Sequence, residues 1–214
     1  MRILKIDLKN PDPSLIRQAA LIIESGGIVA HPTDTAYGLA GNAFSENAIK
    51  KVFKIKGRDF KKPLIVAVRD FAQAEKLVEF NKPGKILFNK FFPGPLTIVL
   101  PKKPTVPDIV TAGKPLGIRI PNCEVTLALS KFCSVPYTTT SANISGGKNP
   151  YSVDEILESF NKKSLEMIDL ILDAGILPEN LPSTVVDISS GDTKILRDGP
   201  VSQAQITEAF LQFS

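Results

Sequence analysis

Residues 12–35, DPSLIRQAALIIESGGIVAHPTDT, decide the fold, because they place a helix, a break and a strand in direct succession. Asp12-Pro13 is typical of a helix start, and apolar residues then recur at helical spacing as far as Ile23. Gly26-Gly27 ends the helix, since glycine adopts backbone conformations that other residues avoid. The apolar run Ile28-Val29-Ala30 then predicts a short buried strand that leads into a polar turn.

Helices and strands alternate in the same way along the rest of the chain. We expect further helices near residues 45–54, 71–80, 83–91, 125–132 and 152–160 and after Ser202, and strands near residues 3–7, 64–68, 97–100, 116–120, 137–140, 170–172, 184–187 and 194–196. Capping boxes open the helices at Ser152 and Ser202. Residues 101–115, rich in proline, predict a long functional or mobile loop. The pattern predicts an α/β (α+β) fold with a mixed sheet, and the length of 214 residues favours one domain.

The scarce residue types exclude several classes of enzyme. The chain has one histidine, His31, two cysteines, Cys123 and Cys133, and no tryptophan. A structural zinc site needs four Cys or His ligands, and a Ser-His-Asp or Cys-His apparatus would depend on His31 alone. The first ten residues do not resemble a signal peptide, and no stretch approaches the ~18 apolar residues of a membrane helix. We therefore expect a reducing, cytoplasmic location.

The positive charge is concentrated in one segment. The net charge is +4 and the pI is near 9.0. Residues 50–62 carry seven basic side chains against Asp59, a net charge of +6, so the rest of the chain is at −2. Such a run is more often a solvated helix face than a binding site. Gly57 favours a binding site here, because it lets Lys56-Gly57-Arg58 turn tightly and direct both cations at one anionic ligand.

Short polar residues gather where predicted strands end. Pro32-Thr33-Asp34-Thr35 either grips a small ligand at the edge of the sheet or satisfies its own backbone. Ser141-Ala142-Asn143, followed by Ser145-Gly146-Gly147, offers hydroxyls, an amide and backbone N–H groups that can hold phosphate oxygens. Arg119 lies inside an apolar strand, where a buried arginine needs a partner, and an anionic substrate is one candidate. The usual glycine-rich nucleotide fingerprints are missing.

In content and order these motifs resemble the YrdC-like family of threonylcarbamoyl-adenylate (threonylcarbamoyl-AMP) synthases. The matching segments are Pro32-Thr33-Asp34-Thr35 with Tyr37-Gly38-Leu39, Lys56-Gly57-Arg58, Pro63-Leu64, Pro93-Gly94-Pro95-Leu96-Thr97, Gly117 with Arg119 and Pro121, Ser141-Ala142-Asn143 with Ser145-Gly146, Pro182-Ser183-Thr184-Val185 with Asp187, and Arg197 with Gly199. The resemblance implies a single YrdC-like domain over residues 1–214, with a twisted mixed β-sheet and flanking helices around a large basic cavity. Some larger members carry a further C-terminal domain, which we do not expect here.

The resemblance also implies a reaction and its partners. A nucleotidyltransferase of this family forms threonylcarbamoyl-AMP and pyrophosphate from L-threonine, bicarbonate or CO2, and ATP. The product serves the N6-threonylcarbamoyladenosine (t6A) modification of tRNA. Mg²⁺ is expected to enter with ATP, and no metal site of the protein's own is expected. The implied downstream partners are tRNA threonylcarbamoyl-transferase proteins; weak tRNA binding is compatible with the charge, and a membrane is not an expected partner.

Site roles follow from the matching positions. The implied catalytic residues are Lys56, Arg58, Ser141 and Asn143; the implied ATP-binding residues are Arg58, Lys62, Ser141, Asn149 and Arg197; and the implied threonine-binding residues are Thr35, Arg119 and Ser183. Ala67 stands where many members have a histidine, which removes one contact on the threonine side. His31 replaces a common aromatic residue, and we expect it to be a structural bystander. The lid over the nucleotide is either missing or supplied by residues 101–115.

A second reading is a non-catalytic RNA-binding or ribosome-assembly module that uses the same basic cavity. Two features weigh against it. Few aromatic residues are interleaved with the basic run, and we expect Phe53 and Phe60 to be in the core. The hydroxyl-rich turns also suit a small ligand better than a stacked base.

Overall fold

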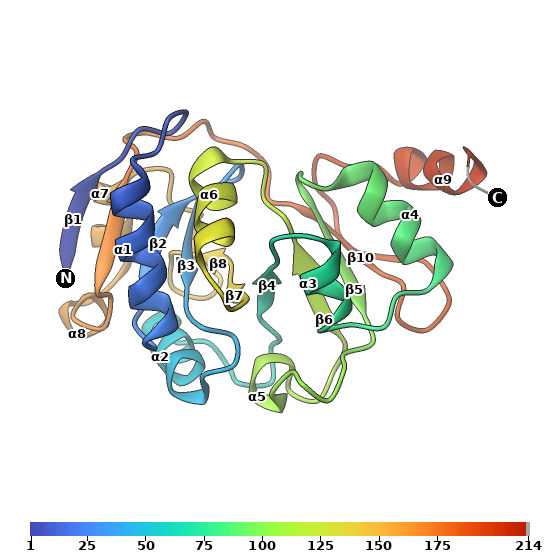
Figure 1. Cartoon of the computed structure of the whole chain (residues 1–214), viewed down its shortest axis with the longest axis horizontal. Coiled ribbons are helices and arrows are strands. Elements are labelled where there is room, and N and C mark those ends of the chain that lie inside the picture. The colour runs from blue at the N-terminus through green and yellow to red at the C-terminus, as the bar shows by residue number, and fades with distance from the viewer. Residues whose placement is uncertain (213–214) are drawn as a thin grey trace.

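The computed structural model describes residues 1–212, and Figure 1 shows strands in the middle of the molecule with helices packed around them. The helices are α1 (Pro13–Glu24), α2 (Glu46–Lys56), α3 (Phe71–Glu75), α4 (Lys82–Phe91), α5 (Asp108–Thr111), α6 (Glu124–Phe132), α7 (Val153–Ser159), α8 (Lys162–Leu165) and α9 (Gln203–Gln212). Most expected helices are present with shifted ends. The helix expected at residues 71–80 is shorter, because it stops at Glu75.

The strands form two mixed sheets, which confirms the α/β class and divides the expected sheet in two. The first sheet has the order β1 (Arg2–Lys5), β9 (Leu170–Asp173), β2 (Val29–Pro32), β3 (Tyr37–Ala40) and β8 (Thr140–Ser141). The second has the order β11 (Lys194–Arg197), β10 (Thr184–Asp187), β5 (Leu96–Leu100), β6 (Leu116–Arg119), β4 (Ile65–Ala67) and β7 (Tyr137–Thr138). Each sheet contains parallel and antiparallel pairs.

The helix start at Asp12 forms as its sequence predicts. Its side chain accepts a hydrogen bond from the Ser14 N–H, and Pro13 occupies the first helical position, where no N–H is needed. The buried face of α1 includes Ile16 and Ile23. Figure 1 shows α1 and α6 side by side over β2 and β3 of the first sheet. The capping box at Ser202 is reciprocal, with Gln205 N–H donating to Ser202 Oγ and Ser202 N–H to Gln205 Oε1.

A strand that sequence reasoning missed lies directly after the polar turn. Tyr37–Ala40 forms β3, which pairs antiparallel with β2, and its residues are buried. The chain therefore reverses between Pro32 and Tyr37, and the polar turn is the tip of a β-hairpin. The alternation of Tyr, Gly, Leu and Ala carries little strand signal, since glycine and alanine are poor strand formers.

The strand expected at residues 137–140 is two strands in different sheets. Tyr137–Thr138 pairs antiparallel with β4 of the second sheet, and Thr140–Ser141 pairs with β3 of the first. Thr139 lies between them and its N–H donates to the Ile65 carbonyl at 2.9 Å. The polar segment that follows β8 is therefore placed where the two sheets meet.

Residues 101–115, expected to form a long functional or mobile loop, are partly packed against the rest of the protein. They contain α5, and Val106, Val110 and Thr111 are buried. The Val110 carbonyl accepts a hydrogen bond from the Leu64 N–H at 2.8 Å. Within residues 1–212, no helix combines the length and the apolar character needed to cross a bilayer.

Candidate functional site

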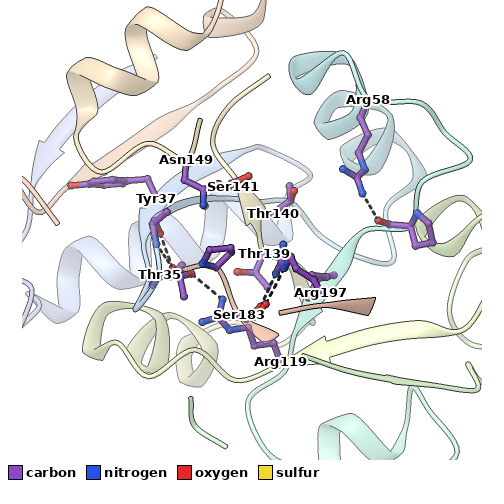
Figure 2. A pocket seen from close by; sticks show the side chains of 16 residues that line it. Thr35, Tyr37, Arg58, Arg119, Thr139, Thr140, Ser141, Asn149, Ser183 and Arg197 are labelled. Carbon is purple, nitrogen blue, oxygen red and sulfur yellow. Dashed lines mark hydrogen bonds between the residues drawn. The ribbon is translucent and has the colours of Figure 1, made fainter. Parts of the chain in front are cut away.

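A solvent-open cavity lies where the two sheets meet. Its lining comes from both sheets: Thr33, Thr35, Ala36, Tyr37, Gly38, Arg58, Pro63, Ile65, Arg119, Thr139, Thr140, Ser141, Asn149, Pro182, Ser183 and Arg197. Figure 2 shows Asn149 and Ser141 on one side of this cavity, with Ser183 and Arg119 opposite. The lining contains three arginines and no carboxylate, so the cavity favours an anionic ligand.

The turn between β2 and β3 is held by the Thr33 side chain. Thr33 Oγ1 donates to the Ala36 carbonyl at 2.7 Å and accepts from the backbone N–H groups of Thr35 and Ala36 at 3.1 and 3.2 Å. This is the self-satisfied turn that the sequence offered as one of two readings. The same turn lines the cavity, so the two readings are compatible.

Arg119, on β6, is 4% exposed and has protein partners on three sides. Its Nη2 contacts Asp34 Oδ1 at 2.5 Å, its Nη1 donates to Thr35 Oγ1 at 3.1 Å, and its Nε donates to the Gly94 carbonyl at 3.4 Å. Burial lowers the pKa of Arg119, and the Asp34 carboxylate opposes this shift. The partner that the buried arginine needs is therefore the Asp34 carboxylate, and an anionic substrate would be an additional partner.

Arg197 and Ser183 form a second polar group at the cavity wall. Arg197, on β11, donates from Nε to the Ser183 carbonyl and from Nη2 to Ser183 Oγ, both at 2.9 Å. Ser183 Oγ also lies 2.9 Å from Thr97 Oγ1 on the neighbouring strand β5. Burial and the nearby positive charge of Arg119 lower the pKa of Arg197. Two guanidinium groups that repel each other across a cavity favour an anion between them.

Arg58 follows the end of α2 and lines the cavity from a third direction. Gly57 ends the helix with a φ of +54°, in the left-handed region where a side chain is disfavoured. Arg58 then donates from Nε to the Lys62 carbonyl at 3.2 Å and from Nη2 to the Pro63 carbonyl at 2.8 Å (Figure 2). Burial lowers the pKa of Arg58. The turn at Gly57 thus directs one cation at the cavity, where the sequence predicted two.

Lys56 lies beneath residues 141–148, and its ammonium is hydrogen-bonded to oxygens of this segment. Its Nζ donates to the carbonyl oxygens of Ser141 and Asn143, the latter at 2.8 Å, and to Asn143 Oδ1 at 3.1 Å. Lys56 is 1% exposed, and burial, with a smaller contribution from Arg58, lowers its pKa to about 7. The predicted catalytic Lys56 therefore supports the segment from behind and does not line the cavity.

Asn143 is likewise a support of this segment. It is 3% exposed, its Oδ1 accepts from Ser141 Oγ at 2.6 Å, and its Nδ2 donates to the carbonyl oxygens of Gly147 and Lys148 at 2.7 and 2.8 Å. The amide closes residues 141–148 into a compact loop. Asn143 is not among the residues that line the cavity, whereas Ser141, to which it is hydrogen-bonded, is.

The structure brings seven of the predicted site residues together at the cavity wall: Thr35, Arg58, Arg119, Ser141, Asn149, Ser183 and Arg197. Three others, Lys56, Asn143 and Lys62, are not part of the lining. Lys62 contributes its backbone carbonyl to Arg58. Among the basic residues of segment 50–62, Arg58 lines the cavity. Lys50 and Lys51 lie on the outer face of α2, where Lys50 pairs with Glu46 and Lys51 donates to the Gly26 carbonyl.

Sequence reasoning assigned no site role to Thr33, Thr139 or Thr140, which also line the cavity, or to Asp34, which holds Arg119. Thr33 and Asp34 belong to a motif that the sequence singled out, and Thr139 and Thr140 belong to an expected strand, so the sequence indicated these segments but not the role of each side chain. His31 is fully buried on β2 away from the cavity lining, and burial lowers its pKa to about 4. This position agrees with the expected bystander role.

Within residues 1–212 no group of three or more His, Cys, Asp or Glu side chains could hold a metal ion. The cavity instead offers hydroxyls, an amide and guanidinium groups. These groups suit phosphate and carboxylate oxygens, and a divalent cation bound to such a ligand would arrive with it.

Comparison with known proteins gives a consistent match. A model of the Sua5/YciO/YrdC family, described as "Telomere recombination", matches residues 21–199. A putative threonylcarbamoyl-AMP synthase of Methanocaldococcus jannaschii is 45% identical over 179 residues, which cover 84% of this chain and 83% of that protein. The threonylcarbamoyl-AMP synthase of Pyrococcus abyssi is 39% identical over 193 residues, 89% of this chain and 56% of its own length.

A solved structure shows the same architecture. The crystal structure of P. abyssi Sua5 complexed with L-threonine superposes with a TM-score of 0.90 at 36% identity, covering 98% of this chain and 61% of that one. This chain thus spans just over half the length of the P. abyssi protein and most of the length of the M. jannaschii protein.

Proposed function

Because this chain belongs to the Sua5/YciO/YrdC family, we propose that it is a threonylcarbamoyl-AMP synthase, a nucleotidyltransferase that acts on ATP. L-threonine, bicarbonate and ATP would give threonylcarbamoyl-AMP, pyrophosphate and water. The observation that carries the proposal is the cavity between the sheets, which combines three guanidinium groups with several hydroxyls. That combination fits an amino-acid carboxylate and a triphosphate in one site.

The two ends of the cavity suggest how the substrates are arranged. Arg119 and Thr35 form a group suited to the carboxylate and polar atoms of threonine, with Ser183 nearby. Arg58 lies away from this group and suits the nucleotide (Figure 2), and we assign Ser141 and Asn149 to the nucleotide as well. Arg197 lies next to Ser183 and suits the nucleotide phosphates closest to threonine.

The proposed chemistry needs positioning and charge neutralisation more than acid-base groups. Threonine reacts with bicarbonate to form a carbamate, whose oxygen attacks the α-phosphorus of ATP while the bond to pyrophosphate breaks. Negative charge moves onto pyrophosphate, where Arg58 would stabilise it, while Arg197 would stabilise the α-phosphoryl group under attack. A well-directed donor of this kind contributes about 10²–10³ in rate. Lys56 and Asn143 would act by holding the loop that carries Ser141.

Magnesium and the cellular partners belong to the same proposal. Mg²⁺ would enter as the MgATP complex, held by phosphate oxygens. The product, an acyl adenylate, would pass to a tRNA threonylcarbamoyl-transferase, so we expect the protein to work in the cytoplasm, where tRNA is modified.

Pyrophosphate release tests the proposal. We expect release from MgATP only when L-threonine and bicarbonate are both present, and a loss of about 100-fold or more in Arg58→Ala. Lys54→Ala is the matched control, because Lys54 is an exposed residue of α2 outside the cavity lining, and we expect its rate to be unchanged. Lys56→Ala and Asn143→Ala should also lose activity, with a lower melting temperature than Arg58→Ala.

Two outcomes would contradict the proposal. One is pyrophosphate release that does not depend on threonine. The other is no release together with tight, salt-dependent RNA binding that Arg58→Ala abolishes, which would favour the RNA-binding reading.

A further inference from the structure

Asp34 is a half-buried acid between two cavity-lining threonines, Thr33 and Thr35, and it is not itself part of the lining of that cavity. Its Oδ1 accepts from Arg119 Nη2 at 2.5 Å, and the two side chains are 13% and 5% exposed. Its other oxygen, Oδ2, is buried and has no hydrogen-bond partner among the described residues. Burial of a carboxylate is costly without compensation, so the ion pair with Arg119 is what holds Asp34 in this position.

Arg119 has N–H groups that are not used by the described residues of the protein. A guanidinium group has five N–H donors. Three of them are directed at protein oxygens, namely Gly94 O, Thr35 Oγ1 and Asp34 Oδ1. Two N–H groups have no acceptor in the described part of the chain, and Arg119 lines the cavity. One spare N–H group is on Nη1 and the other on Nη2, so both terminal nitrogens retain a donor for a ligand carboxylate.

The threonines next to Asp34 are linked to each other and to Arg119. Thr33 Oγ1 donates to the Ala36 carbonyl, accepts from the Thr35 and Ala36 N–H groups, and lies 3.2 Å from Thr35 Oγ1. Thr35 Oγ1 in turn accepts from Arg119 Nη1. Arg119 uses one of the two lone pairs of Thr35 Oγ1, so Thr35 keeps a second lone pair for a ligand. A ligand N–H or O–H group suits this position.

We propose that Asp34 is a positioning residue for the amino-acid substrate. It fixes the guanidinium of Arg119 so that the two spare N–H groups receive the substrate carboxylate, while Thr35 accepts from a neighbouring N–H or O–H of the same molecule. The inference rests on the proposed function, because it takes threonine as the ligand of Arg119. Asp34 would not contact the substrate, but it would determine the affinity for threonine through Arg119.

Steady-state kinetics of Asp34→Asn test the inference, because this change keeps the shape of the side chain and removes its charge. With Arg119 no longer fixed, we expect the KM for threonine to rise by about tenfold or more, while the KM for ATP and kcat stay within about twofold. Asp108→Asn is the matched control. Asp108 pairs with Lys102 at 2.9 Å on α5, outside the cavity lining, and its variant should keep both KM values.

A purely structural role would give a different pattern. An Asp34→Asn variant whose KM for threonine is unchanged, or in which both KM values and kcat shift equally, would overturn the inference. Asp34→Asn leaves a buried cation unpaired, so it could also fail to fold. Asp34→Glu then keeps the charge on a longer side chain. It should fold and still raise the KM for threonine selectively, and an unchanged KM in this variant would equally overturn the inference.

The wild-type protein separates this inference from the proposed function. If wild type releases no threonine-dependent pyrophosphate, the proposed function fails. If wild type is active and the Asp34 variants keep their KM for threonine, only the role of Asp34 fails.

Discussion

Lys56 and Arg58 are two residues apart and have different environments. Lys56 is the last residue of α2 and is buried against the loop at residues 141–148, where its ammonium meets three oxygens. Arg58 comes after the left-handed Gly57, which turns the chain so that the guanidinium reaches the cavity. The sequence shows two cations on either side of a glycine. Only the packing of α2 against the loop decides that Lys56 is buried beneath the loop and that Arg58 lines the cavity.

His31 gives a testable pH dependence at the scale of one residue. Burial lowers its pKa from 6.5 to about 4, so the folded state keeps the imidazole neutral where the unfolded chain already binds a proton. The unfolded state therefore binds more protons between pH 6.5 and 4, and the free energy of unfolding should fall as the pH falls through this window. His31 should lower the free energy of unfolding by about 3 kcal/mol when the pH falls through the whole window.

Urea unfolding of wild type and His31→Phe at pH 7 and pH 4.5 measures this effect. Wild type should lose more stability between the two pH values than the variant does, by about 2 kcal/mol or more. Equal losses in both proteins would show that His31 does not titrate in this way.

At the scale of elements, the segment at residues 137–141 joins the two sheets. Thr138 belongs to β7 of the second sheet, but its hydroxyl bonds to the first sheet. Its Oγ1 accepts from the Gly41 N–H and donates to the Leu39 carbonyl, both at 3.0 Å. The side chain thus takes the place of a backbone partner where the strands diverge.

Thr138→Val should therefore destabilise the protein by about 2–3 kcal/mol, because it removes two buried hydrogen bonds at nearly constant volume. The free energy of unfolding in urea measures the loss. Thr105→Val is the control, since the Thr105 hydroxyl makes one exposed bond to the Lys76 carbonyl, and its cost should stay below about 0.5 kcal/mol. Similar costs for both variants would contradict the joining role of Thr138.

The elements also show which sequence signals are reliable. Helices with a polar cap and an apolar stripe, such as α1 and α2, were predictable because local hydrogen bonds and one buried face decide them. β3 and the division of residues 137–140 were not predictable. Their strand pairing depends on partners up to about 100 residues away, and no local pattern encodes such a partner.

At the scale of the whole molecule, the cavity exists because two sheets meet. Thr35 and Ser141 reach it from the first sheet, and Arg119, Ser183 and Arg197 from the second (Figures 1 and 2). A ligand that contacts both groups connects the sheets, so binding should stabilise the folded state as a whole. The size of the effect follows from mass action, at about 2.7 kcal/mol when the ligand is at 100 times its Kd.

Thermal unfolding with L-threonine, MgATP or both tests this connection. We expect each ligand to raise the Tm, and both together to raise it further. Arg119→Gln should lose the shift with threonine and keep the shift with MgATP, because Arg119 belongs to the threonine end of the proposed site. A threonine-induced shift that persists in Arg119→Gln would place the amino acid elsewhere.

The sequence by itself determined the α/β class, the helix starts and the motifs that reach the cavity, since caps, periodicity and glycine breaks act within a few residues. It also indicated that the chemistry depends on arginines, hydroxyls and an amide, because histidine and cysteine are so scarce. Only the tertiary structure decided that Lys56 and Asn143 support a loop, that Arg119 pairs with Asp34, and that the site lies between two sheets. Burial and hydrogen-bond partners come from segments about 85 residues apart, and the spacing of residues along the chain carries no record of those distances.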